Sequence, residues 1–162
     1  MKAEDRKMKY QFELKGKPED VFDYNFYDVD SKYFETKNKH IKDLSNKKIT
    51  FQIEKPSNKK KIDNVSYATI KVMKYDFPKS FAFDYKSNTY QKYTEYELID
   101  YDQDKDTTTF TVYFYDSIRK NGVTKVRNSD SKDLKKAPLT LKLQFRRSFK
   151  DYMNKKRLIE DE

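Results

Sequence analysis

Apolar and polar side chains alternate near the start of the chain. From Met8 to Leu14 every second residue is apolar, and the residues between them are Lys, Gln and Glu. A period of two predicts a strand with one buried face. Further stretches with this period, separated by polar turns, predict an antiparallel meander. These strands cover residues 49–53, 68–72, 81–85, 90–101 and 110–114.

A helical period follows the first strand. Gly16 ends the strand, and Pro18 with two acidic residues after it suits the first turn of a helix. Apolar residues then recur at spacings of three and four as far as Tyr33. Asp28, Asp30 and Ser31 divide this pattern. The sequence therefore predicts two short helices, the second capped by Ser31.

Residues 137–162 predict a long C-terminal helix. Pro138 suits its first turn. The apolar residues that recur near helical spacing are Leu141, Phe145, Phe149, Tyr152 and Ile159, and basic residues fill the other faces. Residues 139–145 also alternate with a period of two, so a strand before a shorter helix that begins near Arg146 is the alternative.

The order of elements predicts the fold class. A strand, two short helices, a meander and a long helix indicate an α+β fold, in which a curved antiparallel β-sheet wraps around the C-terminal helix. The chain contains no internal repeat and no long flexible linker. We therefore expect residues 1–162 to form a single domain.

The composition indicates a folded chain with an aromatic core. Only 35% of residues are hydrophobic, but the 162 residues include 12 Phe and 14 Tyr, which a disordered chain lacks. The absence of Cys excludes disulfides, thiolate metal ligands and cysteine nucleophiles. The absence of a signal-like start and of a membrane-length apolar run predicts a cytoplasmic protein. The abundance of Lys, Asn, Ile and Tyr is typical of an AT-rich bacterial genome.

Most of the excess of basic over acidic residues lies in the C-terminal part of the chain. The chain has 36 basic and 27 acidic side chains, a formal charge of +9. Residues 118–162 alone carry 14 basic and six acidic groups. Such a region can attract nucleic acid or another polyanion, whereas the simpler interpretation is a solvated helix face. The candidate anion-binding residues are Arg119, Lys120, Arg127, Arg146, Arg147, Lys155 and Arg157.

No catalytic or metal-binding pattern stands out. His40, the only histidine, stands in a basic stretch and is expected to be a surface residue. Aspartates alternate over residues 100–106, but the glycine and the glutamate that a helix–loop–helix calcium loop requires are missing. With only two glycines, the chain offers no glycine-rich phosphate loop. We predict no catalytic residue, no metal ion and no cofactor.

Two short motifs resemble the START-like superfamily, also called SRPBCC or helix-grip proteins. Residues 10–14 read Tyr-Gln-Phe-Glu-Leu, and residues 17–24 read Lys-Pro-Glu-Asp-Val-Phe-Asp-Tyr. Members, which include relatives of plant pollen allergens and polyketide cyclases, often begin with such a strand, a small turn and such a helix start. The chain also looks similar to an uncharacterised subfamily from Gram-positive bacteria.

The resemblance implies a sheet that grips the C-terminal helix, often with an apolar cavity between them. Members bind lipids, sterols, polyketides or other hydrophobic molecules, and a minority are enzymes. We therefore expect non-enzymatic binding of a small hydrophobic or amphipathic ligand between sheet and helix. Close packing of the same side chains in the core is the alternative. The candidate cavity residues are Phe22, Phe26, Phe51, Phe83, Tyr96, Phe110, Phe114, Phe145 and Phe149.

Overall fold

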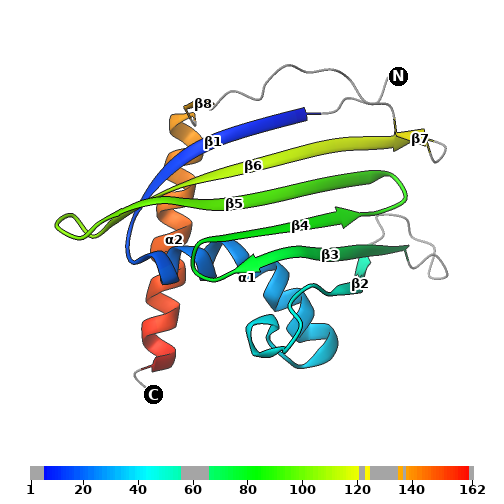
Figure 1. Ribbon diagram of the computed structural model, residues 1–162, viewed down its shortest axis with the longest axis horizontal. Helices are drawn as coiled ribbons and strands as arrows, with labels where there is room; N and C mark the ends of the chain where they lie inside the picture. Colours follow the sequence, from blue (N-terminus) through cyan, green and yellow to red (C-terminus); the bar gives the residue numbers. More distant parts are fainter. Residues whose placement is uncertain (1–5, 56–65, 121–122, 125–134, 137, 161–162) are drawn as a thin grey trace.

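The computed structural model describes residues 6–55, 66–120, 123–124, 135–136 and 138–160. Its elements are shown in Figure 1. In chain order they are β1 (Arg6–Lys15), α1 (Pro18–Lys37), the 3₁₀ turn η1 (Ile41–Asp43), β2 (Thr50–Lys55), β3 (Ser66–Asp76), β4 (Ser80–Lys86), β5 (Tyr90–Asp102), β6 (Thr107–Lys120), β7 (Val123–Thr124), β8 (Lys135–Lys136) and α2 (Leu139–Glu160).

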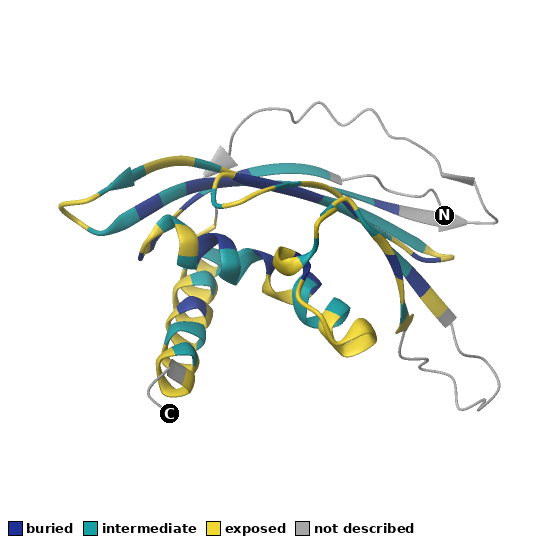
Figure 2. Ribbon diagram, turned by 60° about the horizontal axis from the view of Figure 1, so that its bottom comes forward, coloured by how far each residue is buried: buried dark blue, intermediate teal, exposed yellow. Residues whose placement is uncertain are grey.

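The strands form one sheet in the order β2-β3-β4-β5-β6-β1-β8, and β7 pairs with β6. Neighbours from β2 to β1 are antiparallel, whereas β8 is parallel to β1. Tyr10 lies opposite Val112 and Phe12 opposite Phe110, so apolar residues of β1 and β6 share one face. Figure 2 shows that the sheet is curved and that both helices lie on its concave side. The predicted α+β fold is confirmed.

The prediction of two short helices after the first strand is wrong, because α1 is one continuous helix of 20 residues. Ser31 does not cap a second helix. Its hydroxyl donates to the carbonyl of Asp28 (3.0 Å) inside the helix. The helix ends where Asn38 adopts a left-handed conformation with φ of 55°, a common way to terminate a helix. The only further helical turn among the described residues before β2 is η1.

The C-terminal helix is present, and a strand over residues 139–145 is excluded. The backbone N–H of Lys142 donates to the carbonyl of Pro138 (3.0 Å), so the helix begins directly after the proline. The predicted apolar stripe packs on the core only in its first part. Ile159 was expected in this stripe, but it is 72% exposed, because the last turns of α2 extend beyond the sheet (Figure 1).

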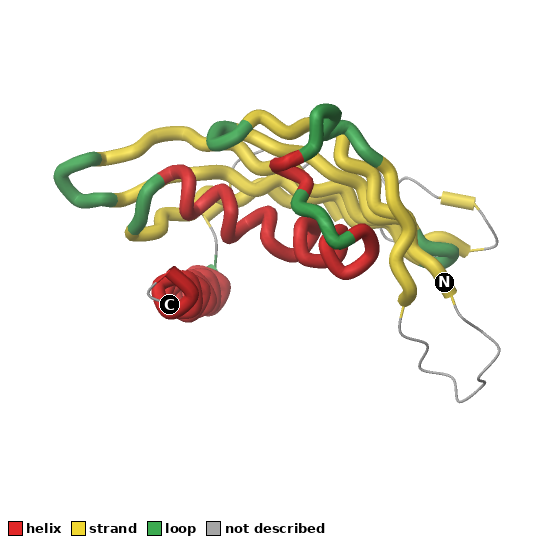
Figure 3. Tube along the Cα trace, turned by 90° about the horizontal axis from the view of Figure 1, so that it is seen from below, coloured by secondary structure: helices red, strands yellow, loops and turns green. Residues whose placement is uncertain are grey.

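The core lies between α1 and the concave face of the sheet. The buried face of α1 consists of Val21, Phe22, Phe26 and Val29. In Figure 3, α1 runs beneath the strands. The first half of α2 packs beside α1, and its Phe145 ring stacks on an aromatic ring of β1. Aromatic rings fill most of this layer, as the composition predicts.

Candidate functional site

The predicted cavity residues all lie on the inner side of the fold. Six of them are buried and form part of the core, namely Phe22, Phe26, Phe51, Tyr96, Phe110 and Phe149. Three are half-buried and pack against it, namely Phe83, Phe114 and Phe145. Many of these rings touch one another: the centroids of Phe22 and Tyr96 are 5.7 Å apart, and those of Tyr96 and Phe110 are 5.2 Å apart.

Two open clefts flank this packed region. One, which we call the helix cleft, lies between α1, η1 and the C-terminal half of α2, and has a volume of about 720 Å³. Of the nine predicted cavity residues, only Phe26 lines it. The other cleft lies beside β2, and Phe51 lines that one. The remaining seven residues line neither cleft.

Aromatic side chains form the walls of the helix cleft. Tyr24 and Tyr27 of α1 face Tyr152 of α2, with both ring centroids 5.6 Å from that of Tyr152. Phe26 packs against Tyr75 of β3 at 5.2 Å. Three elements therefore supply aromatic side chains to the walls of this cleft. Such a surface can bury an apolar group and still offer hydroxyls to a polar one.

Charged residues surround these rings, with equal numbers of acids and lysines. They are Asp23, Asp30, Asp151, Lys42, Lys155 and Lys156. Only part of this set is already paired: the Lys156 ammonium donates to Asp20 of α1 at 2.7 Å and so ties α2 to α1. Partial burial of Lys156 lowers its pKa, but the hydrogen bond to Asp20 and the nearby negative charges outweigh this effect and raise it.

Burial raises the pKa of several titratable groups in the helix cleft, Asp23 and Tyr75 among them. Burial raises the pKa of Asp23, although Lys156 and Lys42 act in the opposite direction. Burial, together with Asp23, Asp30 and Asp43, raises the pKa of Tyr75 to about 12. The Tyr75 hydroxyl therefore stays protonated at neutral pH. It can donate a hydrogen bond to a ligand inside the cleft.

His40 lies at the edge of the helix cleft and belongs to a structural contact. Its Nδ1 is 2.7 Å from one carboxylate oxygen of Asp30, and the other oxygen accepts the N–H of Ile41 at 2.8 Å. The imidazole also stacks on Phe34, with centroids 4.7 Å apart. Its side chain is 45% exposed, as expected for a surface histidine. This arrangement fixes η1, and with it Lys42, against α1.

Comparison with known proteins identifies the fold. The sequence matches no protein-family model and no curated protein. The Mll3558 protein from Rhizobium loti superposes with a TM-score of 0.50 at 9% sequence identity, over 75% of this chain and 85% of its own. Ara h 8.0201 gives a TM-score of 0.47 at 10% identity, over 91% of this chain and 94% of its own.

The chain has the START-like helix-grip fold. The resemblance carried by residues 10–24 is thereby confirmed at the level of the fold. In this helix-grip chain, aromatic rings fill the space between α1 and the sheet, and the helix cleft lies between α1, η1 and α2.

The predicted anion-binding residues of this helix-grip chain are only partly described. Arg146, Arg147, Lys155 and Arg157 are exposed on α2. The side chains of Arg119 and Lys120, at the end of β6, are not described, and Arg127 lies outside the described residues. Lys155 lies at the helix cleft, so one predicted basic residue belongs to the same site as the aromatic walls.

The described residues contain no group of three or more His, Cys, Asp or Glu side chains placed to hold a metal ion. The alternating aspartates form a hairpin turn instead: Asp102 accepts the backbone N–H groups of Asp104 and Lys105 at 3.0 and 3.3 Å. Within the described helices, none is long and apolar enough to cross a membrane.

Most residues of the helix cleft were not predicted from the sequence. Asp23, Lys42, Tyr75 and Ser148 come from different elements, and no local pattern marks them as neighbours. The sequence of α1 alone contained one indication of this cleft. Tyr24 and Tyr27 are three residues apart and flank the buried Phe26, so they lie together beside the buried face of that helix.

Proposed function

We propose that this protein binds a small amphipathic molecule in the helix cleft, without catalysing a reaction on it. The observation that carries this proposal is a cleft of about 720 Å³ with aromatic walls and a charged rim. Pockets for small molecules span about 300 to 1,000 Å³ and combine apolar walls with a few polar groups. The site lies beside α2, and among the described residues Tyr75 is the only one from the sheet that lines it.

The chemistry of the lining indicates how such a ligand binds. Its apolar part packs against the rings of Tyr24, Tyr75 and Tyr152, which are half-buried before binding. Its polar end lies at the rim, where Lys42 and Lys155 attract an acidic group. The protonated Tyr75 hydroxyl donates a hydrogen bond from inside the cleft. Wild-type protein should therefore prefer an anionic amphiphile to its cationic analogue.

Binding of anilinonaphthalene sulfonate, an aromatic anion, tests the proposal. We expect native mass spectrometry to show a one-to-one complex, and thermal unfolding to shift upward with probe concentration. At 100 times Kd, selective binding to the folded state adds about 2.7 kcal/mol, which is roughly 5 to 10 °C in Tm for a chain of this size. The absence of a complex together with an unchanged Tm contradicts the proposal.

Association of the basic α2 surface with a polyanion is a second candidate. It is favoured by Arg146, Arg147 and Arg157, which are exposed and have no ion pair among the described residues. Binding to phosphates releases counterions, so affinity for a labelled DNA duplex should fall steeply between 50 and 200 mM salt, as is typical of about six or more phosphate contacts. No binding at low salt excludes this candidate.

A further inference from the structure

Strand β2 forms the edge of the sheet at the opposite end from β8. It pairs with β3 on one side, and no other described strand pairs with it. An open edge presents unpaired backbone N–H and C=O groups, which another extended chain can use. The β2 edge is therefore a potential binding surface separate from the helix cleft.

The register shows which backbone groups face outward. Thr50 lies opposite Lys71, so Ile49 lies opposite Val72, and the N–H of Val72 donates to the carbonyl of Ile49 at 2.8 Å. In an antiparallel pair, the backbone groups of alternate residues point toward and away from the partner strand. The backbone N–H and C=O groups of Phe51 and Ile53 therefore form hydrogen bonds with β3. The N–H and C=O groups that point away from β3 are those of Thr50, Gln52 and Glu54.

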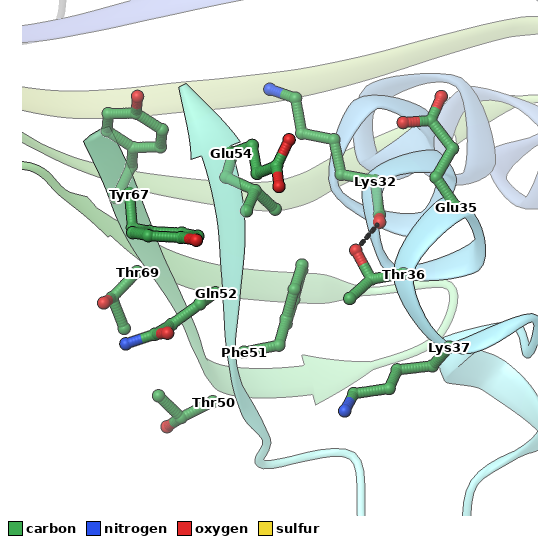
Figure 4. Close-up of a pocket in the computed structure, with 12 residues that line it drawn as sticks. Lys32, Glu35, Thr36, Lys37, Thr50, Phe51, Gln52, Glu54, Tyr67 and Thr69 are labelled. Carbon is green, nitrogen blue, oxygen red and sulfur yellow. Dashed lines mark hydrogen bonds between the residues drawn. The ribbon is translucent and has the colours of Figure 1, made fainter. Parts of the chain in front are cut away.

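A second cleft, the edge cleft, lies along the same strand. It has a volume of about 1170 Å³ and lies between β2 and the last two turns of α1. Figure 4 shows Phe51 pointing from β2 toward α1, on the side where Thr36 and Lys37 lie. Phe51, Ile53 and Tyr85 give the cleft an apolar portion beside the outward-facing backbone groups. Apolar side chains and open backbone donors thus occur together.

The net positive charge of the whole chain favours an acidic partner. Lys32 is bonded to Asp28 at 3.1 Å, but Lys37 is exposed and has no ion pair among the described residues. Glu35 and Glu54 also line the cleft, so the local charge is balanced. The formal charge of +9 on the whole chain then attracts acidic partners over longer distances. It also repels a second copy of the same chain.

We propose that the edge cleft binds an acidic peptide in an extended conformation, which adds to the sheet as a strand beside β2. Its backbone bonds to the outward groups of Thr50, Gln52 and Glu54, and alternate apolar side chains pack beside Phe51 and Ile53, as in other cases of strand addition. The formal charge of +9 disfavours a second copy of the chain at this edge. A peptide is therefore the partner, not a second copy.

The test uses fluorescein-labelled hexapeptides and the full chain. The first probe alternates Asp and Val, the second has the same sequence with alternate backbone amides methylated, and the third has Lys in place of Asp. We expect the first probe to give saturable fluorescence polarisation and the other two to bind at least tenfold more weakly. Equal binding of the methylated probe overturns the proposal, and so does no binding of the first probe at millimolar protein.

Variants of the protein locate the contact. Gln52→Pro removes an N–H that faces away from β3, which an edge strand tolerates, and Gln52→Ala is its control because it keeps that N–H. We expect tenfold weaker binding for the first variant only. Lys37→Glu should weaken binding more than Lys150→Glu, which makes the same change of charge on α2. Equal affinity within either pair contradicts binding at β2, and the methylated probe decides the matter if Gln52→Pro does not fold.

Discussion

Replacing Phe22 by alanine is expected to lower the free energy of unfolding by about 3 to 5 kcal/mol, the range for removing a large aromatic side chain from a core. Phe22 is fully buried, and four neighbouring rings meet it almost perpendicularly, at 88° to 89°. Its ring joins α1 to β3, β4 and β5. The rings in contact with it are Phe26, Tyr75, Phe77, Phe81 and Tyr96.

Urea unfolding followed by circular dichroism measures this loss. Phe34→Ala is the matched control, because Phe34 lies on the same helix, is 41% exposed and stacks on His40 at the surface. We expect the control to cost less than about 1 kcal/mol. If Phe22→Ala lowers the free energy of unfolding no more than Phe34→Ala does, the rings between α1 and the sheet do not form a packed core.

Phe149→Ala is expected to have the second large effect, again about 3 to 5 kcal/mol. Phe149 is 4% exposed, and its ring lies against Gly16, where an added Cβ would come within 2.9 Å of Cζ. It also meets Tyr24 at 5.3 Å. The ring therefore holds α2 against α1 and against the turn between β1 and α1. Its removal should release the helix as well as open a cavity.

Hydrogen exchange distinguishes these two consequences. In Phe149→Ala we expect faster exchange of the α2 amides than of the β5 and β6 amides, in addition to the loss of stability. The control is Leu143→Ala, which shortens a 49% exposed side chain on the same helix and should have a small effect. Equal exchange rates in the two variants contradict a role of Phe149 in holding α2.

The strands and the C-terminal helix could be predicted from the sequence because their patterns are local. The alternating residues 8–14 and 110–114 lie in the paired strands β1 and β6, with Phe12 opposite Phe110. The high Phe and Tyr content correctly indicated an aromatic core. Such patterns involve residues that are close along the chain. They arise because each strand or helix buries one face.

The continuity of α1 could not be predicted, because contacts distant in sequence decide it. Asp30 would favour a break by local propensity. In the fold, its carboxylate accepts from His40 and from the N–H of Ile41, ten and eleven residues away. It therefore caps η1 instead of ending α1. The helix cleft was missed for a similar reason, since its walls come from α1, β3 and α2.

If the proposed ligand binds in the helix cleft, its binding is coupled to the packing of α2. One wall belongs to α1 and the other to α2, and Lys156 already joins them through Asp20. A ligand that packs against the rings of both Tyr24 and Tyr152 adds contacts that exist only while α2 is docked. Binding should therefore slow the opening of α2, because anything that binds only the docked state stabilises it.

The central claim, a ligand site in the helix cleft, is tested most directly by a pair of tryptophan variants on α2. Ser148 lines the cleft, so Ser148→Trp should fill it. Asn154 is exposed on the same helix and does not line the cleft, so Asn154→Trp controls for the added ring. Titration with anilinonaphthalene sulfonate should give at least tenfold weaker binding to Ser148→Trp and wild-type affinity for Asn154→Trp. Equal affinity for the two folded variants would contradict the claim.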